Sequence, residues 1–206
     1  MDYVTIKGQA EASFIEKKSE FIGYIKHVDT GDEAIQFINE IKAMHRKAKH
    51  NVYAYIVRDE NTSRYSDDGE PQGTAGVPVL DVLKKEGLTD VCVVVTRYFG
   101  GILLGGGGLV RAYSHACKLA VDEAVKMIMC ECYEVEAECD YSLYGKISHV
   151  LPEFEVKVLD TLYENNVRVK MLVKAHLFSA LCEKLTDLCN GNIKLEHSEI
   201  TNDDFA

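Results

Sequence analysis

A short acidic loop is the first place in this chain where side chains of suitable type and spacing could do chemistry. Asp67, Asp68 and Glu70 place three carboxylates within four residues, and Thr74 follows them. Such oxygens can hold a hard divalent cation or position a water molecule for hydrolysis. The same residue types also satisfy the N–H groups of turns and helix starts, with Thr74 as a helix cap. Because a metal loop would show more regularly spaced ligands, the spacing favours the structural interpretation and predicts no metal site.

His50 is the histidine that could act beside these carboxylates. It opens an aromatic and β-branched segment, and histidine is the side chain whose charge changes near neutral pH. A lone histidine is more often structural than catalytic. If the protein is an enzyme, its catalytic residues are expected to be His50, Asp67, Asp68 and Glu70.

A glycine-dense turn between an apolar segment and an amphipathic one is the second candidate site. Six of the 15 glycines fall within nine positions, which costs backbone entropy that an ordinary connection does not require. Freed N–H groups at a helix start can bind phosphate or carboxylate, with an arginine on either side. Neither a Walker A loop nor the six-residue dinucleotide pattern is met, so anion binding and tight helix packing both remain open. The expected binding residues here are Arg97, Tyr98, Gly100, Gly101, Gly105, Gly106, Gly107, Gly108 and Arg111.

Charge divides the chain unevenly. Residues 1–128 carry 16 Lys and Arg against 18 Asp and Glu, whereas residues 129–206 carry 7 against 15. An acidic surface repels phosphate, so any contact with a polyanion is expected on the first part. There, Arg46, Lys47 and Lys49 form a local basic cluster that either completes this face or is a solvated helix end.

The seven cysteines indicate reduced thiols, mostly buried. Their number is odd and no Cys-x-x-Cys occurs, which argues against a disulfide framework or a zinc site. No apolar run approaches the roughly 20 residues of a membrane span, and the chain starts without a signal-like segment. We therefore expect a cytoplasmic protein without a cofactor.

Hydrophobic periodicity predicts two domains, residues 1–128 and 129–206. In the first, the patterns predict strands at 19–28, 52–58 and 90–97, helices at 32–47, 74–85 and 108–126, and a polar connection over 59–73. In the second, they predict strands at 131–141, 155–159, 166–173 and 192–199, helices at 144–151 and 177–189, and a frayed tail over 201–206. The β-α-β-β-α-β order of the second domain is the ferredoxin-like arrangement.

Three separated motifs together resemble the signature of the IMPACT family, in its two-domain, YigZ-like bacterial branch. The motifs are HNVYAY from His50, SDDGEP with GTAG from Ser66, and TRYFGG with LGGGGLVRAY from Thr96. The resemblance implies an α+β first domain with a left-handed βαβ crossover, shared with a ribosomal protein and an elongation factor. It also implies a ferredoxin-like second domain. Eukaryotic members are translational regulators that bind a partner of a stress kinase and associate with ribosomes.

From the motifs and this resemblance we expect a non-enzymatic, translation-associated binding protein. The expected partner is structured RNA, the ribosome or a ribosome-bound protein, held by the first domain, with no DNA specificity and no membrane contact. The alternative is an enzyme, either a peptidase-like hydrolase that uses the acidic loop or a phosphate-substrate enzyme that uses the glycine turn.

Overall fold

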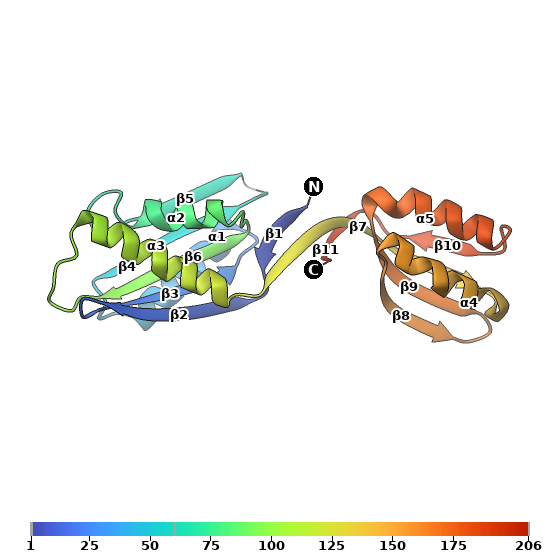
Figure 1. The fold of residues 1–206 in the computed structure, drawn as a ribbon, viewed down its shortest axis with the longest axis horizontal. Coiled ribbons are helices and arrows are strands. Elements are labelled where there is room, and N and C mark those ends of the chain that lie inside the picture. Colours follow the sequence, from blue (N-terminus) through green and yellow to red (C-terminus); the bar gives the residue numbers. More distant parts are fainter. Residues whose placement is uncertain (1, 60, 206) are drawn as a thin grey trace. The chain divides into compact units, whose positions relative to one another are not determined.

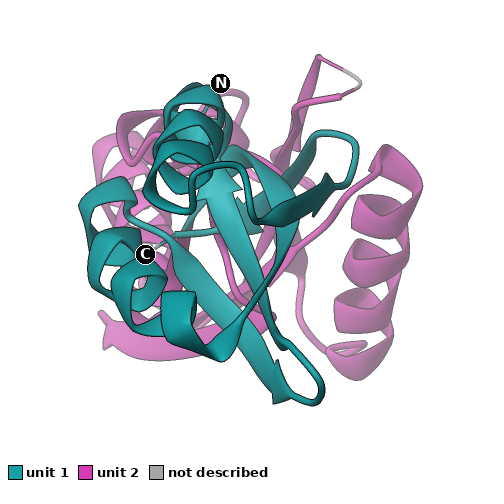
Figure 2. Ribbon diagram, turned by 90° about the vertical axis from the view of Figure 1, so that its right-hand side faces the viewer, with its two compact units in different colours: residues 1–2, 128–206 teal, residues 3–127 magenta. Residues whose placement is uncertain are grey.

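The computed structural model of the protein describes residues 2–59 and 61–205. Met1, Glu60 and Ala206, which fall in the predicted start, polar connection and tail, lie outside the described residues. The chain divides into two compact units, residues 3–127 and residues 1–2 with 128–206 (Figure 2). This division lies next to the boundary at residues 128 and 129 that the sequence predicts.

The first unit is built on an antiparallel sheet with the strand order β2-β3-β6-β4-β5 (Figure 1). The strands of this unit are β1 (Tyr3–Ile6), β2 (Gln9–Glu16), β3 (Ser19–His27), β4 (His50–Val57), β5 (Thr62–Ser66) and β6 (Val91–Tyr98). The central strand β6 is buried from Val91 to Arg97 because helices cover both faces of the sheet. A strand covered on both sides reads as a continuous apolar run, which is what the sequence of β6 shows.

Helices α2 (Gly76–Lys85) and α3 (Gly106–Glu123) cover one face of this sheet, and α1 (Gly31–Met44) covers the other. Side chains of β6 alternate between the two cores. Val91, Val93 and Val95 pack with α2 and α3, whereas Cys92 and Val94 pack with α1. Arg97 continues the first series and therefore lies on the face that carries α2 and α3.

Strands β3 and β4 both run antiparallel to β6, which lies between them, and are therefore parallel to each other. Helix α1 joins them, so the chain makes a β-α-β connection, as the resemblance implies. The hydroxyl of Thr30 caps α1 by accepting the backbone N–H of Glu33. Helix α1 ends at Met44, three residues earlier than predicted, so the whole basic cluster lies in the connection to β4.

The second unit has the ferredoxin-like order. Strand β9 (Val167–Lys174) lies between β7 (Lys126–Cys139) and β8 (Lys157–Tyr163), and β10 (Lys194–His197) pairs with β7 on its other side. Helices α4 (Tyr141–Val150) and α5 (Ala175–Leu188) supply the core residues Ile147, Leu181 and Leu185, and a short 3-10 helix (Leu151–Phe154) follows α4.

Two predicted loops are wrong in part. The polar connection over 59–73 contains β5, which pairs with β4, and the predicted tail forms β11 (Thr201–Asp204), which pairs with β7. Both segments are polar and lie at sheet positions with little burial, so they lack the apolar alternation that identifies a strand. Among the described residues, no helix is long and apolar enough to cross a membrane.

Candidate functional site

The acidic loop between β5 and α2 is first of all a cap for α2. The carboxylate of Asp67 accepts the backbone N–H groups of Gly73, Ala75 and Gly76 at 2.9, 3.0 and 2.8 Å. These N–H groups stand at the start of α2, where the first turn of a helix has no acceptors of its own. The predicted cap, Thr74, instead donates its hydroxyl to a carbonyl of the same loop. The structural interpretation therefore accounts for Asp67.

Asp68 ties the loop to the elements around it. Its carboxylate accepts the ammonium of Lys42 at 2.8 Å and the backbone N–H of Asn51 at 2.6 Å. Its carbonyl oxygen lies 2.9 Å from Nδ1 of His50. Because a carbonyl only accepts, Nδ1 of His50 carries the proton in this bond. Asp68 thus fastens the loop to the end of α1 and the start of β4.

Glu70 reaches further and enters the interior of the first unit, where its side chain is 5% exposed. Its Oε1 accepts Nη1 of Arg97 at 2.5 Å and the hydroxyl of Tyr113 at 2.8 Å, and Nε2 of His50 lies 4.0 Å away. His50 and Arg97 are cross-strand neighbours on β4 and β6, and Tyr113 comes from α3. Burial, and then the carboxylate of Glu70, raise the pKa of Tyr113, so its hydroxyl stays protonated and donates.

Arg97 is predicted to contact an anionic ligand, but the structure buries it. Its side chain is 6% exposed, and its guanidinium lies 5.4 Å from the ring centre of Phe21 and 5.5 Å from that of Phe99. The carboxylate of Glu70 already neutralises the charge of Arg97. The Nε of Arg97 has no hydrogen-bond partner in the part of the chain that the structure describes. In this structure Arg97 stabilises the end of the sheet and is not exposed to a ligand.

Tyr98, the next predicted contact, is held by the histidine that caps the C-terminal end of α1. Its hydroxyl lies 2.9 Å from Nδ1 of His45, and Nε2 of the same ring lies 2.7 Å from the hydroxyl of Tyr24. These bonds join α1 to β3 and β6 at the end of the sheet. Tyr98 therefore links elements, and its ring is partly buried.

The glycines of the turn differ in what the chain itself requires of them. A Cβ on Gly100 would lie 1.9 Å from the carbonyl oxygen of Lys18, so the turn needs glycine where it meets the β2–β3 hairpin. Gly101 and Gly105 have φ of 86° and 71°, which other residues adopt at a cost. At Gly106 and Gly107, in contrast, an added Cβ would meet no atom nearer than 3.9 Å, and φ is not positive.

Neither packing nor backbone conformation requires glycine at Gly106 and Gly107, which stand in the exposed first turn of α3. Gly105 provides no side-chain cap for this helix, and Gly106 and Gly107 are exposed. Glycine in the first turn of a helix leaves the backbone N–H groups open to a close approach from solvent.

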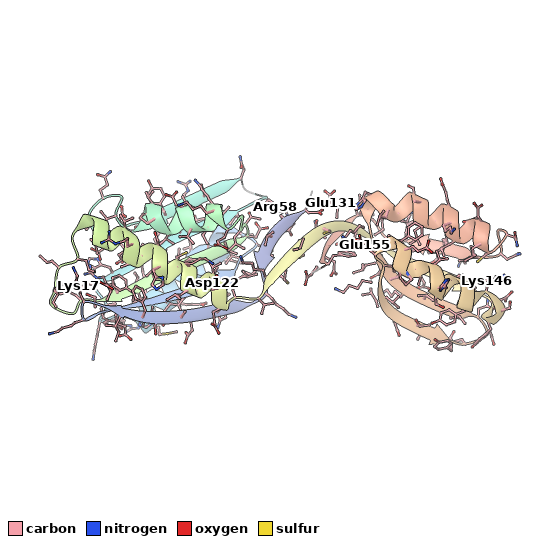
Figure 3. All side chains as sticks on the ribbon, viewed as in Figure 1. Lys17, Arg58, Asp122, Glu131, Lys146 and Glu155 are labelled. Atoms are coloured by element: carbon pink, nitrogen blue, oxygen red, sulfur yellow. The ribbon has the colours of Figure 1, made fainter. Side chains whose placement is uncertain are left out.

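Exposed cations surround this turn at the same end of the sheet. Arg46, Lys47 and Lys49 lie between α1 and β4, and Arg111 lies on α3. Sequence reasoning missed two more cations, Lys17 and Lys18, at the tip of the β2–β3 hairpin. Figure 3 labels Lys17 at this end of the first unit, away from Asp122 at the other end of α3. None of these six cations has an ion-pair partner among the described side chains.

A cavity of about 260 Å³ lies between the hairpin tip and α3. Lys17, Arg111 and His115 bring cationic or ionisable nitrogens to it, and Glu16 brings one carboxylate. Its remaining lining is Phe14, Leu104, Gly108 and Ala112. Lys17 and Lys18 have φ of 45° and 66°, values that suit a tight two-residue hairpin but are unusual for lysine. Apolar and polar residues alternate along most of 9–16, a mainly apolar segment follows over 19–27, and only Lys17 and Lys18 separate the two segments. This pattern is the sequence signal that could have revealed the hairpin turn.

The geometry offers little to a hydrolase. Asp67 and Asp68 already accept protein donors, and Glu70 is buried against Arg97. A nucleophile or base would have to break these bonds before it could reach a substrate. The four predicted catalytic residues do come together, but they form a polar network that supports the fold.

Comparisons with known proteins find relatives along nearly the whole chain. Residues 17–121 match the Impact N-terminal domain, and residues 138–192 match a domain of unknown function, DUF1949. The IMPACT family member YvyE of Bacillus subtilis (strain 168) is 38% identical over 200 residues, which cover 97% of this chain and 92% of the relative. The IMPACT family member YigZ of Escherichia coli (strain K12) is 33% identical over 182 residues, covering 87% and 89%.

A solved structure titled "Crystal structure of an hypothetical protein" has the same fold along almost the whole chain. Its TM-score is 0.61 at 30% identity, and the alignment covers 94% of this chain and 96% of that one. The three motifs, which lie between His50 and Tyr113, all fall within residues 17–121, the region that matches the Impact N-terminal domain.

Proposed function

Because the chain belongs to the IMPACT family, in its two-domain YigZ-like branch, we propose that it is a translation-associated regulatory protein that binds structured RNA, and so the ribosome, through its first unit. The binding surface is the end of the sheet that carries the glycine turn. We call this surface the turn face, and its residues are Lys17, Lys18, Arg46, Lys47, Lys49, Gly106, Gly107 and Arg111.

The observation that carries the proposal is the gathering of cations without carboxylate partners around an open helix start. The first unit has a slight excess of acidic residues, so six cations on one face are a local concentration. Lysine and arginine bind the phosphate backbone without reading sequence, and the N–H groups of Gly106 and Gly107 are open to a phosphate oxygen. Lys17 and Arg111, which line one cavity, would hold one phosphate between them.

The buried network has a supporting role in this proposal. Glu70 and Arg97 fix the end of β6, from which the glycine turn departs, and the N–H of Gly100 donates to the hydroxyl of Ser19 and holds the turn against the β2–β3 hairpin. A rigid base of this kind keeps the cations of the turn face at constant spacing. The motifs of the family would then preserve the shape of the surface, while the exposed cations make the contacts.

Co-sedimentation with purified ribosomes tests the proposal. The variant Lys17→Glu with Arg111→Glu is compared with Lys7→Glu with Arg64→Glu, which changes the net charge equally at exposed positions outside the turn face. We expect the first variant to lose about tenfold or more of its affinity and the second to stay close to the unmodified protein. Equal losses in both variants, or no association of the unmodified protein, would reject the turn face as the binding surface.

A further inference from the structure

A second exposed groove lies between α2 and α3, outside the network and the glycine turn. It has a volume of about 480 Å³. Its lining comes from α2 and its C-terminal end, and from the exposed side of α3: Val82, Lys85, Glu86, Val110, Arg111, Ser114, His115 and Lys118. The helices pack through buried residues beneath it, where the thiol of Cys117 lies 3.7 Å from the carbonyl oxygen of Val79. The groove is therefore a surface feature over a closed core.

The lining of this groove combines aliphatic side chains with positive charge. Val110 on α3 is 37% exposed, and Val82 on α2 is partly buried. Lys85 and Arg111 stand on opposite helices and have no ion-pair partner in the described ranges. Covering apolar surface of this kind with a partner removes it from water and so favours binding.

The one carboxylate of the lining does not cancel this charge. Glu86 accepts Lys126 at 2.7 Å, and Lys118 lies 3.2 Å from its other oxygen. The hydrogen bond from Lys126 is the main reason that the pKa of Glu86 is lowered, so this side chain is charged and already neutralised. Any further charge that a partner brings to the groove would meet Lys85 and Arg111.

We propose that this groove binds an acidic amphipathic helix of a partner protein. Two apolar residues one turn apart would cover Val82 and Val110, and carboxylates beside them would pair with Lys85 and Arg111. Helices that dock in grooves use this pattern of apolar anchors with charges along the edges. The proposal adds a protein-binding site to the RNA-binding turn face and does not depend on it.

The lining favours a helix over a nucleic acid. RNA presents phosphates and bases, and bases are held by stacking on aromatic rings. His115 has the one aromatic ring in this lining, and it packs edge-on against Phe14 with ring centres 4.7 Å apart. Phosphates would leave the two valines without an apolar partner. Arg111 lines both the groove and the cavity of the turn face, so it is not used to distinguish the two sites.

Fluorescence anisotropy with the full chain and a labelled 14-residue helical peptide tests the proposal. The peptide carries leucines one turn apart and glutamates beside them, and a second peptide carries lysines in place of the glutamates. The variant Lys85→Glu with Val110→Ser is compared with Lys7→Glu with Val125→Ser, which makes the same changes at exposed positions outside the groove.

We expect the acidic peptide to bind and the lysine peptide to fail. The groove variant should bind the acidic peptide about tenfold or more weakly, and the control should stay within about twofold. Equal binding of both peptides, equal affinity of both variants, or no binding of the acidic peptide would overturn the proposal. A tenfold loss of RNA affinity in the groove variant would also overturn it, by assigning the groove to the nucleic-acid surface. Unchanged thiol reactivity of Cys92 and Cys117 shows that the variants remain folded.

Discussion

Replacing Glu70 with alanine leaves the guanidinium of Arg97 buried without its carboxylate. Both side chains are about one-twentieth exposed, so water cannot replace the lost partner. Breaking a buried pair from one side costs about 3–5 kcal/mol, whereas an exposed pair is worth about 1 kcal/mol or less. Against a typical domain stability of about 5–15 kcal/mol, the loss would increase the unfolded fraction of the first unit by roughly two to three and a half powers of ten.

The cysteines of the chain provide an assay that separates the two units. Cys92 and Cys117 are fully buried in the first unit, and burial raises the pKa of both thiols. They react with a thiol reagent when this unit opens, so their labelling rate reports its opening equilibrium. Peptide mass spectrometry distinguishes them from the five cysteines of residues 128–206, whose labelling should not change. The chain contains no tryptophan, which makes fluorescence less informative.

Two further variants make the result decisive. Asp122→Ala breaks the exposed pair with Lys118 on α3 and should change labelling by less than about tenfold. Glu70→Leu combined with Arg97→Met and Tyr113→Phe should recover most of the stability, because apolar side chains of similar size can replace a buried ion pair together with the hydroxyl that bonds to it. If Glu70→Ala increased labelling no more than Asp122→Ala, the network would be solvated and its supporting role would be wrong.

Three further changes probe the glycine turn, the cap of α2 and the hydrogen bond of Tyr113. Gly100→Ala should destabilise the first unit, because the new Cβ would lie 1.9 Å from the carbonyl oxygen of Lys18. Thermal unfolding followed by circular dichroism should therefore show a lower Tm. The control Gly73→Ala, with open space around the Cβ and a φ of 74°, should lower the Tm less. Asp67→Ala should cost about 1 kcal/mol of stability, as the loss of a helix cap does. Amide hydrogen exchange should become faster in the first turn of α2. Faster exchange throughout the first unit would contradict a local cap. Tyr113→Phe removes a donor to Glu70 and should cost about 1.5–3 kcal/mol at neutral pH. Burial raises the pKa of Tyr113 above its ordinary 10.0, so this residue stabilises the fold below pH 10 and loses that contribution as the pH rises further. Above pH 10, the free energy of urea unfolding should therefore depend less on pH for the Tyr113→Phe variant than for the unmodified protein.

The sequence predicts the elements whose burial produces a clear pattern. The run of β-branched residues in β6 and the helical spacing in α1 lead to the observed elements within a few residues. The β-α-β-β-α-β order of the second unit is confirmed for the same reason. Strands β1, β2, β5 and β11 were not predicted. Strands β5 and β11 are polar, so their sequences lack the apolar alternation that identifies a strand.

The roles of the motif residues could not be read from local spacing. Glu70 meets Arg97 27 positions later and Tyr113 43 positions later, so the pairing appears only when the loop folds over the end of the sheet. Asp67 likewise caps N–H groups six to nine residues away, beyond the reach of a standard helix cap. Arg97 reads as a free cation in the sequence, and its place on the core face of β6 makes it a buried one.

If the cations of the turn face bind RNA, the affinity for RNA should fall as the salt concentration rises, and removing two of these cations should weaken that dependence. The affinity for a labelled RNA hairpin is measured from low to physiological salt for the unmodified protein and for Lys17→Ala with Arg111→Ala. Each lost phosphate contact should lower the slope of log affinity against log salt by about 1, so we expect a slope smaller by about 2 and weaker binding throughout. An unchanged slope, with the same affinity for both proteins, would contradict the claim.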